Sequence, residues 1–143
     1  MASNIYTTGL QNVGSYMVSG VPWITGSTLT GNAISGPGQD NAQDTITFPY
    51  VTKSIMITRT GGSGSDNDLR VHFAATGSGN VISGKHFLTL TSTNSSTLNV
   101  KCTQIFLSIA STSTDTATYE IAADLTAIPA ARMFTLTGSG ITE

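Results

Sequence analysis

The chain has 143 residues, of which 41 are Ser or Thr, whereas only 6 are Lys or Arg and 8 are Asp or Glu. This length fits one domain with a hydrophobic core, and the net charge of -2 excludes a basic field that would attract nucleic acid. Many β-branched and turn-forming residues with few charges favour a structural or adhesive β-protein over an enzyme with a charged cleft.

Residues 1–44 differ from the rest of the chain. They contain seven of the fifteen glycines, with single apolar or aromatic residues between them. No stretch is regular enough to predict a long strand, yet the segment is too apolar for a solvated linker. We therefore predict an extended N-terminal arm over 1–44, lying on its own domain or on a neighbouring subunit, and a β-sandwich domain over 45–143. The residues expected to contact that surface are Tyr6, Leu10, Tyr16, Val21 and Trp23.

A β pattern begins at Thr45. Residues 45–59 carry apolar side chains at both parities, so both faces of this strand are expected to be partly apolar. Glycine, serine and acidic residues interrupt the pattern at 61–67, and residues 68–74 then alternate as in a half-buried strand. The predicted inward residues are Leu69, Val71 and Phe73, and the predicted outward residues are Arg70 and His72.

Further strands are predicted at 81–91, 97–109, 117–128 and 132–136. Within 97–109 the apolar residues change parity, which predicts a bulge or a corner near Thr103 and Gln104. Polar turns separate these strands, and no amphipathic helix is evident. The pattern predicts an all-β fold, an antiparallel β-sandwich or jelly roll.

The chain shows no catalytic constellation. Nucleophilic catalysis needs a base beside a Ser or Cys, and the two histidines, His72 and His86, lie at an outward strand position and at a strand start. Glu120 and Asp124 share a strand face, but their Cα atoms would lie about 13 Å apart, which is wide for a paired-carboxylate mechanism. We therefore expect no enzymatic activity, no catalytic residue and no cofactor.

Asp66 and Asp68 are the candidates for a metal site, because calcium favours acidic residues on flexible loops. The spaced ligand pattern of a calcium loop and its distal Glu are absent, so we expect a solvated turn and no metal. Cys102 is the only cysteine, which excludes an intrachain disulfide. It lies in an apolar run and is expected to be a small buried residue.

No targeting or membrane segment is apparent. The first twenty residues have no cationic start followed by an apolar stretch of signal-peptide length, and no segment approaches the ~20 apolar residues of a membrane span. We expect synthesis in a cytoplasm without a cleaved export signal, and no contact with a membrane.

Four stretches of the chain are similar to one group of proteins. They are residues 6–16 (YTTGLQNVGSY), 68–73 (DLRVHF), 98–102 (LNVKC) and 132–140 (RMFTLTGSG). These stretches resemble small virion structural proteins of marine tailed bacteriophages, including phages of cyanobacteria. The resemblance implies a place on the phage particle, on the capsid or on the tail.

With the small size, low charge and apolar arm, this resemblance implies a capsid decoration, or cement, protein that binds the outer capsid lattice. It would be made in the host cytoplasm and located on the capsid exterior of the virion. Its partner would be the major capsid protein, and we expect a homo-oligomer, a trimer or another ring. Two alternatives remain open. One is a tail, collar or fibre component; the other is a carbohydrate-binding host-attachment module, with Tyr50, Phe106 and Tyr119 as candidate exposed aromatics.

Overall fold

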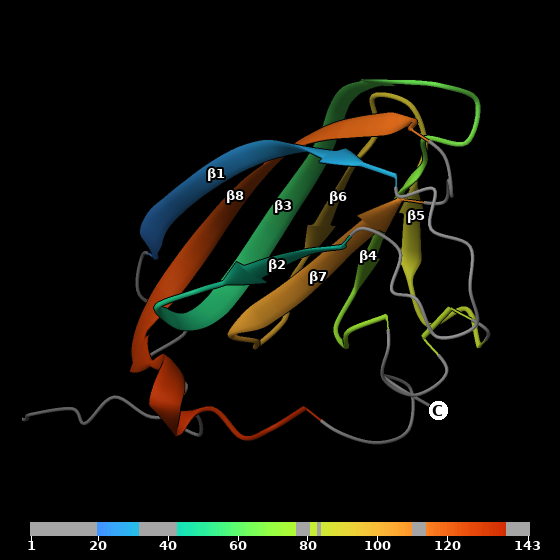
Figure 1. Cartoon of the computed structure of the whole chain (residues 1–143). Coiled ribbons are helices and arrows are strands. Elements are labelled where there is room, and N and C mark those ends of the chain that lie inside the picture. The colour runs from blue at the N-terminus through green and yellow to red at the C-terminus, as the bar shows by residue number, and fades with distance from the viewer. Residues whose placement is uncertain (1–19, 32–42, 77–80, 83, 110–113, 137–143) are drawn as a thin grey trace, which may run out of the picture.

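The computed structural model describes residues 20–31, 43–76, 81–82, 84–109 and 114–136. Within them the chain forms two antiparallel sheets of four strands each (Figure 1). Sheet A has the strand order β1-β8-β3-β6, and its strands are β1 (Val21–Thr30), β8 (Thr116–Pro129), β3 (Tyr50–Ser63) and β6 (Ser95–Leu98).

Sheet B has the strand order β2-β7-β4-β5. Its strands are β2 (Gln43–Thr47), β7 (Gln104–Ile109), β4 (Leu69–His72) and β5 (Leu88–Leu90). One turn of 3-10 helix, η1 (Ala130–Arg132), follows β8. The predicted all-β antiparallel sandwich is confirmed.

The two sheets enclose one hydrophobic core, because alternate residues of each long strand are apolar. Ile121 of β8 and Ile55 and Ile57 of β3 have no exposed surface. Burial of one such side chain stabilises the fold by about 1.5–3 kcal/mol. Sheet B supplies the opposite wall of the core with Leu69, Val71, Ile105, Leu107 and Ile109.

A partly buried hydrogen bond joins the two sheets. The Tyr119 hydroxyl of β8 donates to Asp44 Oδ2 of β2 over 2.6 Å. Burial raises the pKa of the Tyr119 phenol far above its usual value, and the neighbouring Asp44 carboxylate raises it further. The hydroxyl therefore keeps its proton and remains a donor to Asp44.

The predicted arm includes a full strand of the sandwich. β1 pairs with β8 along its whole length, from Val21 opposite Leu125 to Thr30 opposite Thr116, and Leu29 is buried in the core. Residues 20–31 therefore belong to the sandwich, as do Gln43 and Asp44 in β2. The other residues of the predicted arm lie outside the described part of the chain.

The parity change within 97–109 marks the corner at which the chain passes from sheet A to sheet B. β6 ends at Leu98 and β7 begins at Gln104. Thr52 of β3 holds the crossing segment, because its hydroxyl donates to the Val100 carbonyl (2.7 Å) and accepts from the Cys102 amide (3.1 Å). Cys102 is fully buried, as expected.

His72 points away from the core, as its predicted outward position requires, but it is fully buried. The residues after β4 cover that face of sheet B. The Ala74 carbonyl lies 2.6 Å from His72 Nδ1, and the Thr76 amide donates to Gln43 Oε1 of β2 over 2.8 Å. Alternation alone reports which side of a strand a residue occupies, and it does not report whether another segment covers that side.

Four predictions about the strands also differ from the structure. Residues 45–59 do not form one strand, because β2 lies in sheet B and β3 in sheet A. Residues 132–136 form no strand, because Arg132 ends η1 and residues 133–136 pair with none of the strands described. β3 continues through Gly61 and Gly62 to Ser63, since β8 still pairs with it there. Of the described residues within 81–91, only Leu88–Leu90 form a strand.

Candidate functional site

The outer face of sheet A carries a row of apolar side chains. Ile24 of β1 and Met56 of β3 both lie opposite Ala122 of β8, and directly opposed residues share a face of the sheet. Ile24 is 77% exposed and Met56 is 45% exposed. Figure 1 shows the three strands side by side, with β8 between β1 and β3. Further along this face the residues are polar or glycine: Gly26, Thr28, Thr58, Thr118 and Glu120.

The apolar row is hollowed, because the short Ala122 side chain lies between two longer ones. A depression of about 260 Å³ results, and Pro22 extends its apolar lining along β1. Asp124 lies at its rim, where Ser54 Oγ donates to Asp124 Oδ2 over 3.0 Å and fixes the carboxylate. We call Pro22, Ile24, Met56 and Ala122 the sheet A strip. The depression is suited to apolar side chains, and the Asp124 carboxylate at its rim favours hydrogen-bond donors over acidic groups.

Two of the five predicted contact residues lie on β1, at positions that alternate with Pro22 and Ile24 of the strip, and they differ in exposure. Val21 is 54% exposed at the start of β1. Trp23 is directed toward the core, where its ring packs edge-on against Phe48 with centroids 5.0 Å apart, although it also contributes to the depression. The three remaining predicted residues lie outside the described part of the chain: Tyr6, Leu10 and Tyr16.

Sequence reasoning missed the centre of the strip. Ile24 and Ala122 lie on strands whose outward residues are otherwise mostly polar, so neither one stands out in the sequence. Met56 did give a signal, because residues 45–59 carry apolar side chains at both parities. The strand register that brings the three residues into one row cannot be derived from the sequence pattern.

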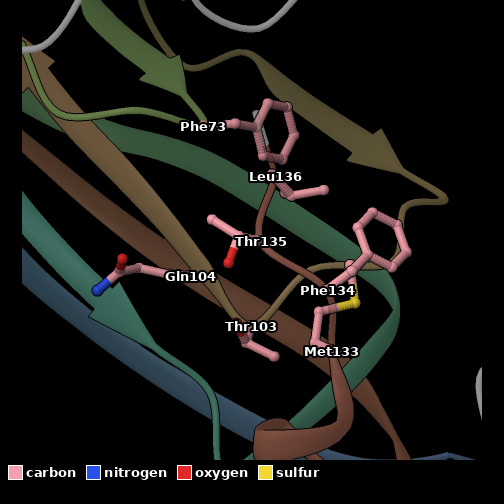
Figure 2. Close-up of a pocket in the computed structure, with 7 residues that line it drawn as sticks. All are labelled: Phe73, Thr103, Gln104, Met133, Phe134, Thr135 and Leu136. Atoms are coloured by element: carbon pink, nitrogen blue, oxygen red, sulfur yellow. The ribbon is translucent and has the colours of Figure 1, made fainter. Parts of the chain in front are cut away.

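A second depression, of about 240 Å³, lies between the segment after η1 and the start of β7 (Figure 2). Figure 2 shows the Thr135 side chain directed toward Gln104, whereas the Phe134 ring lies on the opposite side of the segment, beside Met133. Phe134 is 61% exposed. Sugar sites place an aromatic face over hydrogen-bonding groups. Here the ring and the polar groups face different ways, which gives little support to carbohydrate binding at this depression.

The aromatic residues considered for a sugar site do not form one surface either. Tyr119 is buried, so its predicted exposure was wrong, because its side of β8 faces the core. The ring of Phe106 stacks on His72 with centroids 6.0 Å apart and is only partly exposed. Tyr50 is 40% exposed at the start of β3.

His72 and Ser108 form a histidine–serine pair that sequence reasoning did not find. His72 Nε2 lies 2.9 Å from Ser108 Oγ, and His72 Nδ1 lies 2.6 Å from the Ala74 carbonyl oxygen. The carbonyl can only accept, so Nδ1 carries the proton and Nε2 accepts from the serine hydroxyl. Catalysis by such a pair needs access for a substrate. Both side chains are fully buried, so the pair fixes the packing of β4 against β7.

The structure places Asp66 and Asp68 in the loop after β3 with different partners. The Asp66 amide donates to Asp115 Oδ2 over 3.2 Å, and Asp68 Oδ1 accepts from Arg59 Nη1 over 3.4 Å. Arg59 is almost fully buried, so Asp68 partly offsets the cost of burying its charge. Among the residues that the structure describes, no three His, Cys, Asp or Glu side chains are placed to hold a metal ion.

The described part of the chain is thus an all-β sandwich with an apolar depression on the outer face of one sheet. No protein-family model matches the chain, and no curated protein matches it either. The described residues include no helix long and apolar enough to cross a membrane.

Proposed function

We propose that this protein is a structural component of a tailed-phage virion, a capsid decoration protein that binds the outer capsid lattice and stabilises it. The observation that carries the proposal is the sheet A strip, an exposed apolar row on a hydroxyl-rich sheet. Exposed apolar surface of this kind indicates contact with another protein. The four sequence stretches that resemble phage virion proteins support the virion as the place of that contact.

The function rests on binding alone, without chemistry. A stable protein contact buries about 800 Å² per partner, and four side chains on three strands cover less than that. The strip would therefore act together with contacts to the major capsid protein. A homo-oligomer presents several such contacts at once, and their combined avidity exceeds that of each alone.

The decisive measurement is the number of copies per particle. Quantitative mass spectrometry of purified virions should find this chain in a fixed ratio to the major capsid protein, at a number that matches the capsid lattice. A few copies per particle would instead assign the chain to the tail, collar or fibre, and absence from the virion would reject a structural role.

A further inference from the structure

We propose that the sheet A strip binds residues 1–19 of a neighbouring copy of this chain, so that copies join head to tail. This inference deepens the proposed function, because it names the contact that would hold the oligomer together. It is also testable on the purified protein, without a virion.

The sheet A strip is the surface that would bind this segment, and it lies in one row across three strands. Ile24 is the most exposed large hydrophobic side chain in the described part of the chain, and Met56 lies two strands away at the same level of the sheet. The Ala122 methyl group between them leaves room for an inserted side chain. Burial of Ile24 and Met56 by a docked segment would stabilise the contact, because both side chains would leave water.

The chemistry of residues 1–19 matches this surface. The segment contains no Lys, Arg, Asp or Glu, so it can cover an apolar depression without removing a charged side chain from water. After Met1, its large apolar residues stand singly or in runs of two or three between small and polar ones. They are Ile5, Tyr6, Leu10, Val13, Tyr16, Met17 and Val18.

The position of Gly20 favours a neighbouring copy over the same copy. Gly20 is packed against Asp124, at the rim of the depression, so tightly that an added Cβ would lie 2.7 Å from Asp124 Cβ. From there β1 runs across the strip through Pro22 and Ile24. A strand continued in the same line before Gly20 would leave the strip at this edge, so a neighbouring copy placed beyond the edge could receive it.

The length of the segment is sufficient for this exchange. Nineteen extended residues reach about 60 Å at about 3.3 Å each, which exceeds the diameter of a domain whose radius of gyration is about 13 Å. Because the segment and the strip are different surfaces, the contact is heterologous. A heterologous contact that closes on itself produces a ring, such as the expected trimer.

The test uses full-length chains with a charge placed on one side of the contact. One variant carries Ile24→Asp in the strip, and the other carries Tyr6→Asp, Leu10→Asp and Tyr16→Asp in the segment. We expect the unaltered protein to be an oligomer by light scattering over a concentration series. Each variant should associate about 10- to 100-fold more weakly, because it loses apolar burial at the contact.

Mixing the two variants gives the sharper result. The Ile24→Asp chain keeps an intact segment and the triple variant keeps an intact strip, so an equimolar mixture should form a species of two chains that grows no further. Matched controls add the same charges elsewhere: Ser95→Asp on the outer face of sheet A, and Asn4→Asp with Asn12→Asp and Ser15→Asp in the segment. Both controls should retain the oligomer.

Each other outcome overturns the inference. A monomeric unaltered protein, an Ile24→Asp chain that still forms the oligomer, or a mixture that stays monomeric would each show that the segment does not dock on a neighbour's strip. If two strips paired with each other instead, Ile24→Asp would abolish the oligomer and the triple variant would retain it. The copy number in virions does not depend on these results, so either proposal can fail alone.

Discussion

The protonation of His72 follows from where its ring lies. The imidazole has no exposed surface, and burial lowers its pKa because a buried cation loses hydration. The hydrogen bond to the Ala74 carbonyl opposes this effect, and the positive charge of Arg70 adds to it. The neutral ring, with its proton on Nδ1, is therefore the form that the folded protein favours.

We predict that the protein loses stability as the pH falls below about 6.5, the pKa of an unperturbed histidine. Because the pKa of His72 is lower in the folded state, the unfolded state binds a proton first, and acid favours unfolding. The free energy of unfolding from urea titrations should change little between pH 8 and 6.5 and decrease from there to pH 5. His72→Gln should flatten this decrease, whereas His86→Gln should retain it. Equal slopes in the two variants would contradict the assignment.

Among the strands, β3 has the most irregular pairing. Its register with β8 shifts between Arg59 and Gly61, and Gly62 follows with φ of 145°. A Cβ at Gly62 would lie 2.1 Å from the Thr116 carbonyl oxygen of β8, whereas a Cβ at Gly61 would meet nothing within 4 Å. A side chain thus fits at Gly61 but not at Gly62, because the strands approach closely only at Gly62.

We predict that Gly62→Ala destabilises the protein by about 1–3 kcal/mol or more, because alanine is strained at this φ and its Cβ overlaps the β8 backbone. Gly61→Ala is the matched control. It should leave stability unchanged or raise it by about 0.4–1 kcal/mol, since alanine restricts the unfolded chain. Urea denaturation of both variants measures the difference. Equal losses would mean that β3 and β8 do not approach closely at Gly62.

The strands show how far sequence alone leads. Period-two patterns locate most of β3, β4, β7 and β8, because one face of each lies on the core. β1 was missed, because only Trp23 and Leu29 mark its inward face and its pairing with β8 supplies the rest. The candidate site was not predicted, because the row through Ile24, Ala122 and Met56 depends on register between strands distant in sequence. Val21 and Trp23 alternate along β1 with the residues of the strip and are directed to its other face.

At the scale of the whole molecule, the sandwich has one core and two natural probes of it. Trp23, the only tryptophan, packs on Phe48 beside sheet A, and Cys102, the only cysteine, is buried at the corner between the sheets. Burial raises the pKa of the Cys102 thiol, and the hydrogen bond between Thr52 and the thiol opposes this effect. The folded thiol is therefore both covered and protonated, which makes it unreactive.

We predict that Trp23 fluorescence and Cys102 reactivity toward an aromatic disulfide reagent report the same unfolding midpoint in urea. A single core of this size unfolds in one cooperative transition, so the two probes should change together. The rate at which a small free thiol reacts with the same reagent, measured at each urea concentration, corrects for the effect of urea on the reagent. Modification of Cys102 at urea concentrations where Trp23 is still native would instead show that the corner opens separately.

The place of β8 within sheet A has a consequence for the synthesis of the chain. β8 lies between β1 and β3, and the Thr28–Thr118 hydroxyl contact spans 90 residues of sequence. At about 5–20 residues per second, a ribosome needs roughly 5–20 s to make that span. During this interval β1 lacks its neighbour, and β3 has an unpaired edge on the side that β8 later occupies. The nascent chain therefore cannot complete sheet A until almost all of it has been made, and its unpaired strand edges are open to association with other chains until then.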